Sequence, residues 1–245
     1  MDIKKTVKDS YAKIAQTSGG CGCESCGCGS NQAVQRQSGK LGYSQKEMNQ
    51  APAGSNLGLG CGNPVAIASL KEGETVLDLG SGAGFDAFLA SSKVGQTGKV
   101  IGIDMTEEMV QKARDNTKRG GYTNVEFRLG DIEALPVKDN TVDAIISICA
   151  INLVPDKAQV FKETYRVLKP GGRLMISDVV LTKSLPEKLK QDKELLVGCI
   201  SGAILKKDYL ELLKQAGFSK ITIHKETPGF LKDYSVSLTF SAFKP

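Results

Sequence analysis

Along residues 63–217, short apolar segments with strand character alternate with segments of helical periodicity, and this alternation constrains the possible fold most strongly. The predicted strands are 75–79, 99–103, 125–129, 142–148 and 173–180. The predicted helices are 63–70, 85–93, 106–118, 157–168 and two helical pieces within 186–217. Strands that alternate with helices form βαβ units, which build a mainly parallel sheet with right-handed connections. We therefore predict an α/β fold with helices on both faces of the sheet.

Two further strand-like segments, 218–224 and 234–243, close the chain. The residues between them leave no room for a full helix, so we expect an antiparallel hairpin at one edge of a seven-stranded sheet. At the other end, residues 4–16 predict a short amphipathic helix, and residues 17–60 predict loop and weak helix because Gly, Ser, Asn and Gln dominate there. We divide the chain into an N-terminal Cys/Gly-rich segment, 1–60, and a domain, 61–245.

Charge and composition exclude several classes of function. The chain has 32 Lys and Arg against 27 Asp and Glu, and its lysines are spread out, which does not indicate a nucleic-acid groove. No apolar run approaches the roughly 18 residues that span a bilayer, and the N-terminus has no apolar signal region. We expect a cytoplasmic protein without a membrane partner, in which most of the seven cysteines are reduced. A single histidine excludes chemistry that needs a histidine pair.

Three features follow the predicted strands at their carboxyl ends, where ligands bind in open α/β sheets. The first is a turn with the spacing G-x-G-x-G, formed by Gly80, Gly82 and Gly84, which enters a helix. The second is Asp104, which ends the second strand about 20 residues later, where an acidic side chain meets ribose hydroxyls. The third is Asp131, which follows the third strand. Together they predict a site for a nucleoside cofactor.

This pattern resembles the class I S-adenosylmethionine methyltransferases, which have a Rossmann-like fold. The resemblance implies that the glycine turn holds the methionine moiety, that Asp104 binds the ribose, and that Asp131 and the backbone of Ile132 bind the adenine. Asp78 and Met105, which lie beside the glycine turn and Asp104 in the sequence, belong to the same predicted cofactor site.

Three cysteines lie outside the N-terminal segment, in the contexts GCGNP for Cys61, CAINLVPDK for Cys149 and GCISGA for Cys199. With DLGSGAGFDAF, GIDMTEEMV and YRVLKPGGRLMISDV, these segments closely resemble the arsenite S-adenosylmethyltransferases. The resemblance implies that the three cysteines bind trivalent arsenic, arsenite or its thiol conjugates, as thiolates. It also implies that residues of about 181–206 form an arsenic-binding insertion.

The chemistry of arsenic agrees with this assignment. Trivalent arsenic is soft, and soft centres select thiolates over imidazole and carboxylate. Three sulfurs leave a lone pair on arsenic that can attack the sulfonium methyl group in line, with no proton to remove. The protein then has to position the reacting atoms about 3–3.5 Å apart. The resemblance thus implies an arsenic-detoxifying methyltransferase that depends on a thiol reductant of thioredoxin or glutathione type, or on a thiol-disulfide reductase.

The N-terminal segment carries a separate cluster, Cys21, Cys23, Cys26 and Cys28. Four thiols within eight residues are compatible with zinc, although structural zinc sites usually join two pairs from further apart. A thiol relay to a core cysteine, arsenic delivery and a plain thiol-rich tail are the alternatives.

A few residues near these motifs allow less specific predictions. Asn152 and Asp156 are predicted caps of the following helix, and Asn152 is close enough to the site to touch substrate. Tyr11 covers the cofactor or simply packs, and Lys4, Lys5 and Lys8 form a solvated helix face.

Two other functions remain compatible with parts of the sequence. A methyltransferase of a small organic acceptor, such as a quinone precursor, would explain the cofactor motifs but not Cys61, Cys149 and Cys199. A non-catalytic thiol protein that sequesters arsenic would leave the cofactor motifs without a purpose.

Overall fold

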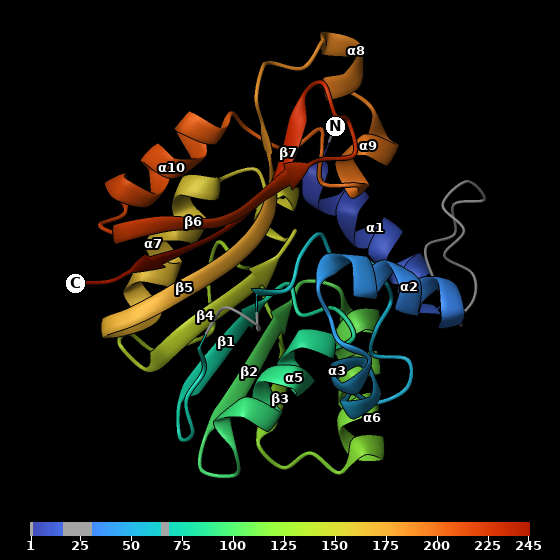
Figure 1. Cartoon of the computed structure of the whole chain (residues 1–245), viewed down its shortest axis with the longest axis vertical. Coiled ribbons are helices and arrows are strands. Elements are labelled where there is room, and N and C mark those ends of the chain that lie inside the picture. Colours follow the sequence, from blue (N-terminus) through green and yellow to red (C-terminus); the bar gives the residue numbers. More distant parts are fainter. Residues whose placement is uncertain (1, 17–30, 65–68) are drawn as a thin grey trace.

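The computed structural model describes residues 2–16, 31–64 and 69–245, and these contain a seven-stranded sheet. The strands are β1 (Thr75–Leu79), β2 (Lys99–Asp104), β3 (Val125–Leu129), β4 (Val142–Ile148), β5 (Leu168–Leu181), β6 (Ser219–Pro228) and β7 (Ser235–Phe243). Their order is β3-β2-β1-β4-β5-β7-β6 (Figure 1). Strands β1 to β5 are parallel, and β7 runs antiparallel to both β5 and β6. The predicted Rossmann-like sheet with an antiparallel edge pair is confirmed.

Helices cover both faces of this sheet. Those described are α1 (Ile3–Gln16), α2 (Asn31–Leu41), α3 (Gln45–Gln50), α5 (Phe85–Val94), α6 (Glu107–Gly120), α7 (Lys157–Val167), α8 (Glu187–Lys190), α9 (Lys193–Val197), α10 (Lys206–Gln215) and the 3₁₀ helix η1 (Ile151–Leu153). Side chains alternate along each strand, so Leu77 and Leu79 pack with α7 and α10, whereas Val76 packs with α5 and α6. None of the described helices has the length and apolar character to cross a membrane.

Strand β6 runs to Pro228 rather than ending at 224, and the predicted helix 63–70 includes residues 65–68, which lie outside the described residues. Two other segments differ from the sequence prediction in their structure. Strand β5 begins at Leu168 rather than at Arg173, because Val142 pairs with Leu168 while Ala144 pairs with Arg173, and the residues between form a bulge. The region 186–217 contains three helices instead of two pieces. Asp192 caps α9 by accepting from two backbone N–H groups, and the chain then leaves the helix at Gly198 to form a turn before α10.

The carboxyl ends of the parallel strands form the edge of the sheet that matters for the site. The chain order reverses between β1 and β4, which is where ligands bind in this architecture. Helix α1 lies at this edge, in contact with α6, α9 and η1 (Figure 1). The N-terminal helix therefore packs beside both predicted binding regions.

Candidate functional site

The turn between β1 and α5 presents bare backbone to a cavity. The glycines that share positive φ are Gly80 (+67°), Gly82 (+51°) and Gly84 (+94°), a conformation that L side chains rarely adopt. The N–H groups of Gly80 and Ser81 donate to the carbonyl of Ile103 at 2.8 and 3.0 Å, which ties the turn to the end of β2. A Cβ on Gly80 would lie 2.5 Å from the Cβ of Ala150. The turn can stay this close to the loop after β4 only with glycine at position 80.

Asp104, at the end of β2, holds the glycine turn. Its Oδ2 accepts from the N–H of Gly82 at 2.9 Å, and its Oδ1 accepts from the N–H of Thr106 at 2.9 Å. Burial raises the pKa of this carboxyl, and the hydrogen bonds to Thr106 and Gly82 act in the opposite direction. The side chain of Thr106 and the N–H of Met105 also bond this carboxyl, and the role of Asp104 toward ribose hydroxyls stays a prediction.

Two polar atoms, one in the turn and one at the end of β1, have no hydrogen-bond partner among the described residues. They are Asp78 Oδ2 and Ser81 Oγ, both buried. Burial, followed by the neighbouring Asp86 and Asp104, raises the pKa of Asp78 well above its ordinary value. Buried polar atoms are normally paired, so these atoms and the acidic surroundings fit a ligand with hydrogen-bond donors and positive charge. S-adenosylmethionine, with its ammonium, sulfonium and ribose groups, has that chemistry.

Asp131 and Ile132 lie beyond the end of β3 and line the same cavity as Met105. The expectation that Lys4 is only solvated is wrong, because its Nζ is 2.5 Å from Asp131 Oδ2 and also pairs with Glu133. Helix α1 brings the ammonium to these carboxylates from 127 residues away. Of the three lysines, Lys5 and Lys8 are exposed, as predicted.

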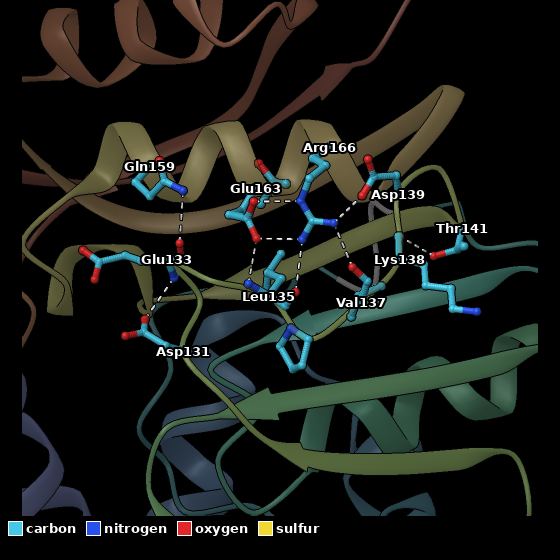
Figure 2. Close-up of polar contacts among 12 residues, drawn as sticks. Asp131, Glu133, Leu135, Val137, Lys138, Asp139, Thr141, Gln159, Glu163 and Arg166 are labelled. Atoms are coloured by element: carbon cyan, nitrogen blue, oxygen red, sulfur yellow. Dashed lines mark hydrogen bonds and ion pairs between the residues drawn. The ribbon is translucent and has the colours of Figure 1, made fainter.

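The segment that carries Asp131 is fixed to helix α7 by a chain of polar contacts (Figure 2). Asp131 Oδ1 accepts from the N–H of Glu133 at 2.9 Å, and Gln159 donates to the carbonyl of Glu133 at 3.2 Å. Further along, the Arg166 guanidinium donates to Glu163 and to backbone carbonyls of the same segment. The predicted adenine-binding wall is therefore anchored on a helix of the domain.

A single cavity unites most of these residues. Its lining includes Gly80, Gly82, Asp104, Met105, Asp131, Ile132 and Cys149, together with Val7, Tyr11 and Tyr43. Tyr11, on α1, both lines this cavity and has its hydroxyl 3.4 Å from the carbonyl of Val197. It therefore lines the cavity and packs against the insertion, while its predicted role as a cover of the cofactor stays a prediction.

The three core cysteines lie close together, and one of them, Cys149, lines this cavity. The structure joins Cys61 and Cys149 in a disulfide with Cα atoms 6.3 Å apart, inside the usual range for such a bond. The thiol of Cys199 donates to the carbonyl of Cys149 at 3.0 Å. The carbonyl of Ser177 in β5 accepts from the N–H of Cys149 at 2.9 Å and lies 3.2 Å from Cys61 Sγ. Ser237 in β7 donates to the carbonyl of Cys61 at 2.9 Å.

The disulfide differs from the expectation that these cysteines are free thiols. In this form the described residues contain no group of three His, Cys, Asp or Glu side chains that could hold a metal ion. Reduction of the Cys61–Cys149 bond would release two thiols beside Cys199. Burial, then the nearby Asp178, raises the pKa of the Cys199 thiol well above its ordinary value. Binding of a soft ion at Cys199 therefore has to displace a proton.

Sequence reasoning missed the role of two side chains at this site. Asp156 caps α7 as predicted, but Asn152 does not: it is buried in η1 and donates to Asp178 and to the carbonyl of Cys199. The sequence also gives no prediction for Tyr43, whose hydroxyl lies 2.7 Å from Asp86 Oδ1 and 3.1 Å from the carbonyl of Gly62, next to Cys61. Both residues come from unremarkable sequence, so no local signal marked them.

Asp86, at the start of α5, has a pKa raised to about 7 by burial, while the hydrogen bond from Tyr43 lowers it.

The cluster Cys21, Cys23, Cys26 and Cys28 lies outside the described residues.

Comparison with known proteins gives a consistent picture. The family described as "Methyltransferase domain" matches residues 70–217. An arsenite methyltransferase of Halobacterium salinarum is 45% identical over 100% of this chain and 67% of its own length. The arsenite methyltransferase of Mus musculus is 36% identical over 99% of this chain and 68% of its length. This chain thus spans about two thirds of both relatives.

A solved structure agrees with the sequence relatives. The crystal structure of an arsenic(III) S-adenosylmethionine methyltransferase from Chlamydomonas reinhardtii superposes with a TM-score of 0.64 and 33% sequence identity. The match covers 86% of this chain and 73% of that structure.

Proposed function

This chain belongs to the arsenite methyltransferase family of S-adenosylmethionine-dependent enzymes, and from that premise we propose that it methylates trivalent arsenic held by Cys61, Cys149 and Cys199. The position of Cys149 carries the proposal. Cys149 lines the cavity that contains the glycine turn and Asp104, and it is bonded to Cys61 and contacted by Cys199. An atom bound by these sulfurs would lie beside the cofactor cavity, where a methyl group can reach it.

The methyl transfer requires positioning rather than proton transfer. S-adenosylmethionine supplies an electrophilic methyl group on a sulfonium. Arsenic donates its lone pair to the new As–C bond, while the S–CH₃ bond breaks and its electron pair stays on the departing thioether. Asp104 and the glycine turn hold the cofactor side, and the three cysteines hold the arsenic side. Asp78, whose Oδ2 has no partner among the described residues, would offer the cofactor a hydrogen-bond acceptor beside the turn.

The thiol chemistry of the site supports a requirement for a reductant. Methylation raises the formal oxidation state of arsenic by two. Formation of the Cys61–Cys149 disulfide from two thiolates releases two electrons, the number that returns arsenic to the trivalent state. An external thiol of thioredoxin or glutathione type then reduces the disulfide for the next cycle. We place this reaction in the cytoplasm, where such reductants keep thiols available.

The test compares Cys149→Ser and Cys199→Ser with the parent protein in the presence of excess thiol reductant. Serine keeps the approximate size but replaces a soft ligand with a hard one. We expect both variants to lose methylation of arsenite while they bind S-adenosylmethionine with parent affinity. The measurements are methylated arsenic formed over time and calorimetric cofactor binding.

A parallel assay offers a catechol-type acceptor in place of arsenite. If both variants methylate arsenite at the parent rate, the cysteine assignment is wrong. Transfer to the organic acceptor alone would favour the alternative methyltransferase function.

A further inference from the structure

The turn that carries Cys199 holds this residue in an unfavourable backbone conformation. Cys199 has φ +64°, in the left-handed region, and it is 4% exposed. An L residue with a side chain adopts this conformation only when its surroundings determine it. Cys149 has the same property, with φ +53°. The contacts around both cysteines therefore determine their backbone conformation.

Asn152 makes the contacts that join these two segments. It lies in η1, three residues after Cys149, and is 1% exposed. Its Nδ2 lies 2.8 Å from Asp178 Oδ1, 2.5 Å from the carbonyl of Val179 and 3.3 Å from the carbonyl of Cys199. One amide group thus connects the segment after β4, strand β5 and the Cys199 turn.

The orientation of the Asn152 amide is determined by its surroundings. All three partners of Nδ2 are acceptors, so a flipped amide would place its oxygen against three oxygens. Its Oδ1 is buried without a partner among the described residues, which shows that the donor side decides the orientation. Asp178 is itself fixed, since its Oδ2 accepts from Tyr209 at 3.1 Å and its Oδ1 accepts from the N–H of Val179 at 3.0 Å.

Close packing between the two segments depends on a glycine. A Cβ on Gly202 would lie 2.1 Å from the backbone oxygen of Asn152. The turn after Cys199 therefore lies directly against η1, without an intervening side chain. This contact and the Asn152 amide act on the same pair of segments, those that carry Cys149 and Cys199.

We propose that Asn152 is a positioning residue that holds the Cys199 turn against the Cys149 segment and so provides arsenic with its third sulfur. The proposal rests on the function proposed above. Asn152 touches neither arsenic nor cofactor in this role. It acts through the backbone of Cys199 and through the anchored Asp178.

The test measures how many sulfurs surround bound arsenic, by X-ray absorption spectroscopy. The full chain is used with its N-terminal cysteines replaced by serine, so that they supply no additional sulfur: Cys21, Cys23, Cys26 and Cys28. A phosphine reductant opens the disulfide and contributes no thiol. The variants are Asn152→Ala and Asn152→Leu, of which the second keeps the side-chain volume. Asn124→Ala is the matched control, because this amide bonds Ser91 and Gly95 at the amino end of β3, away from the cysteines.

We expect three sulfurs in the parent and in Asn124→Ala, and two in both Asn152 variants. The dissociation constant for arsenite should rise about 10- to 100-fold, as is usual when a residue that orients a ligand is removed. The dissociation constant for S-adenosylmethionine should stay at the parent value, which also shows that each variant folds. A purely structural role would change both constants together.

Cys199→Ser in the same background separates the two proposals. If Cys199→Ser retains three sulfurs, the ligand assignment of the proposed function is wrong. If Cys199→Ser falls to two sulfurs while Asn152→Leu keeps three with parent arsenite affinity, the positioning role of Asn152 is overturned. Asn152→Leu decides the question in case Asn152→Ala does not fold.

Discussion

Substitution of Asp104 would test how the cofactor half of the site is organised. The carboxylate accepts from the N–H groups of Gly82 and Thr106, both at 2.9 Å, and so connects the glycine turn to the start of α6. Asp104→Asn keeps the shape but replaces one acceptor oxygen with an NH₂ group that faces a backbone donor. Asp104→Ala removes both acceptors. Each change also removes the carboxylate that we expect to accept from the ribose hydroxyls.

The expected loss follows from the hydrogen bonds. A hydrogen bond to a charged group contributes about 1.5–3 kcal/mol. If loss of one such bond to the ribose weakens cofactor binding by that amount, the dissociation constant rises about 12- to 160-fold. The arsenic side should be unaffected, because Cys61, Cys149 and Cys199 are held by β5, β7 and η1 rather than by Asp104.

Isothermal titration calorimetry with S-adenosylmethionine and, separately, with arsenite under reducing conditions measures both effects. Glu107→Gln is the matched control, since it removes an exposed carboxylate three residues away in the first turn of α6. Parent cofactor affinity in Asp104→Ala would refute the assignment of Asp104 to the ribose. An equal loss of arsenite affinity would refute the separation of the two halves.

Two more predictions concern the packing around the site. The pKa of Asp86 is about 7 in the folded protein and about 4 in the unfolded chain. Because the folded state therefore binds the proton more tightly, the free energy of unfolding should fall as the pH rises from about 4 to 7. Asp86→Asn should flatten part of that slope in urea unfolding of the cofactor-free protein, and an unchanged slope would contradict the buried carboxyl. Gly202→Ala should destabilise the fold by about 1–3 kcal/mol through its collision with Asn152 and weaken arsenite binding. Gly39→Ala, in open space within α2, is its control and should stabilise by about 0.5–1 kcal/mol.

The parts of the fold that depend on local sequence were predictable. The segments 75–79, 125–129 and 142–148 match β1, β3 and β4 to the residue, because short segments rich in apolar residues and flanked by turn residues favour a strand locally. The glycine turn was predictable for the same reason, since positive φ at three positions leaves a recognisable composition.

Features that depend on distant residues were not predictable from the sequence. The ion pair of Lys4 with Asp131 joins residues 127 positions apart, and the disulfide of Cys61 with Cys149 joins residues 88 positions apart. The extra pairing of Leu168 with Val142 arises from a bulge, which depends on the neighbouring strand rather than on the sequence of β5 alone. The role of Asn152 was not predictable either, because it depends on three acceptors in β5 and in the Cys199 turn.

The two halves of the site differ in how many segments of the chain build them. The cofactor half consists of turns at the ends of β1, β2 and β3, whose geometry is determined within a few residues. The acceptor half is built from three separate segments, each of which carries one cysteine. These segments are held together by contacts with the carbonyl of Ser177, the hydroxyl of Ser237 and the amide of Asn152. Cys199 enters through the segment between β5 and α10, which contacts the core through η1 and α1. Substitutions in that segment should therefore change the acceptor that is bound while the glycine turn and Asp104 keep binding the same cofactor.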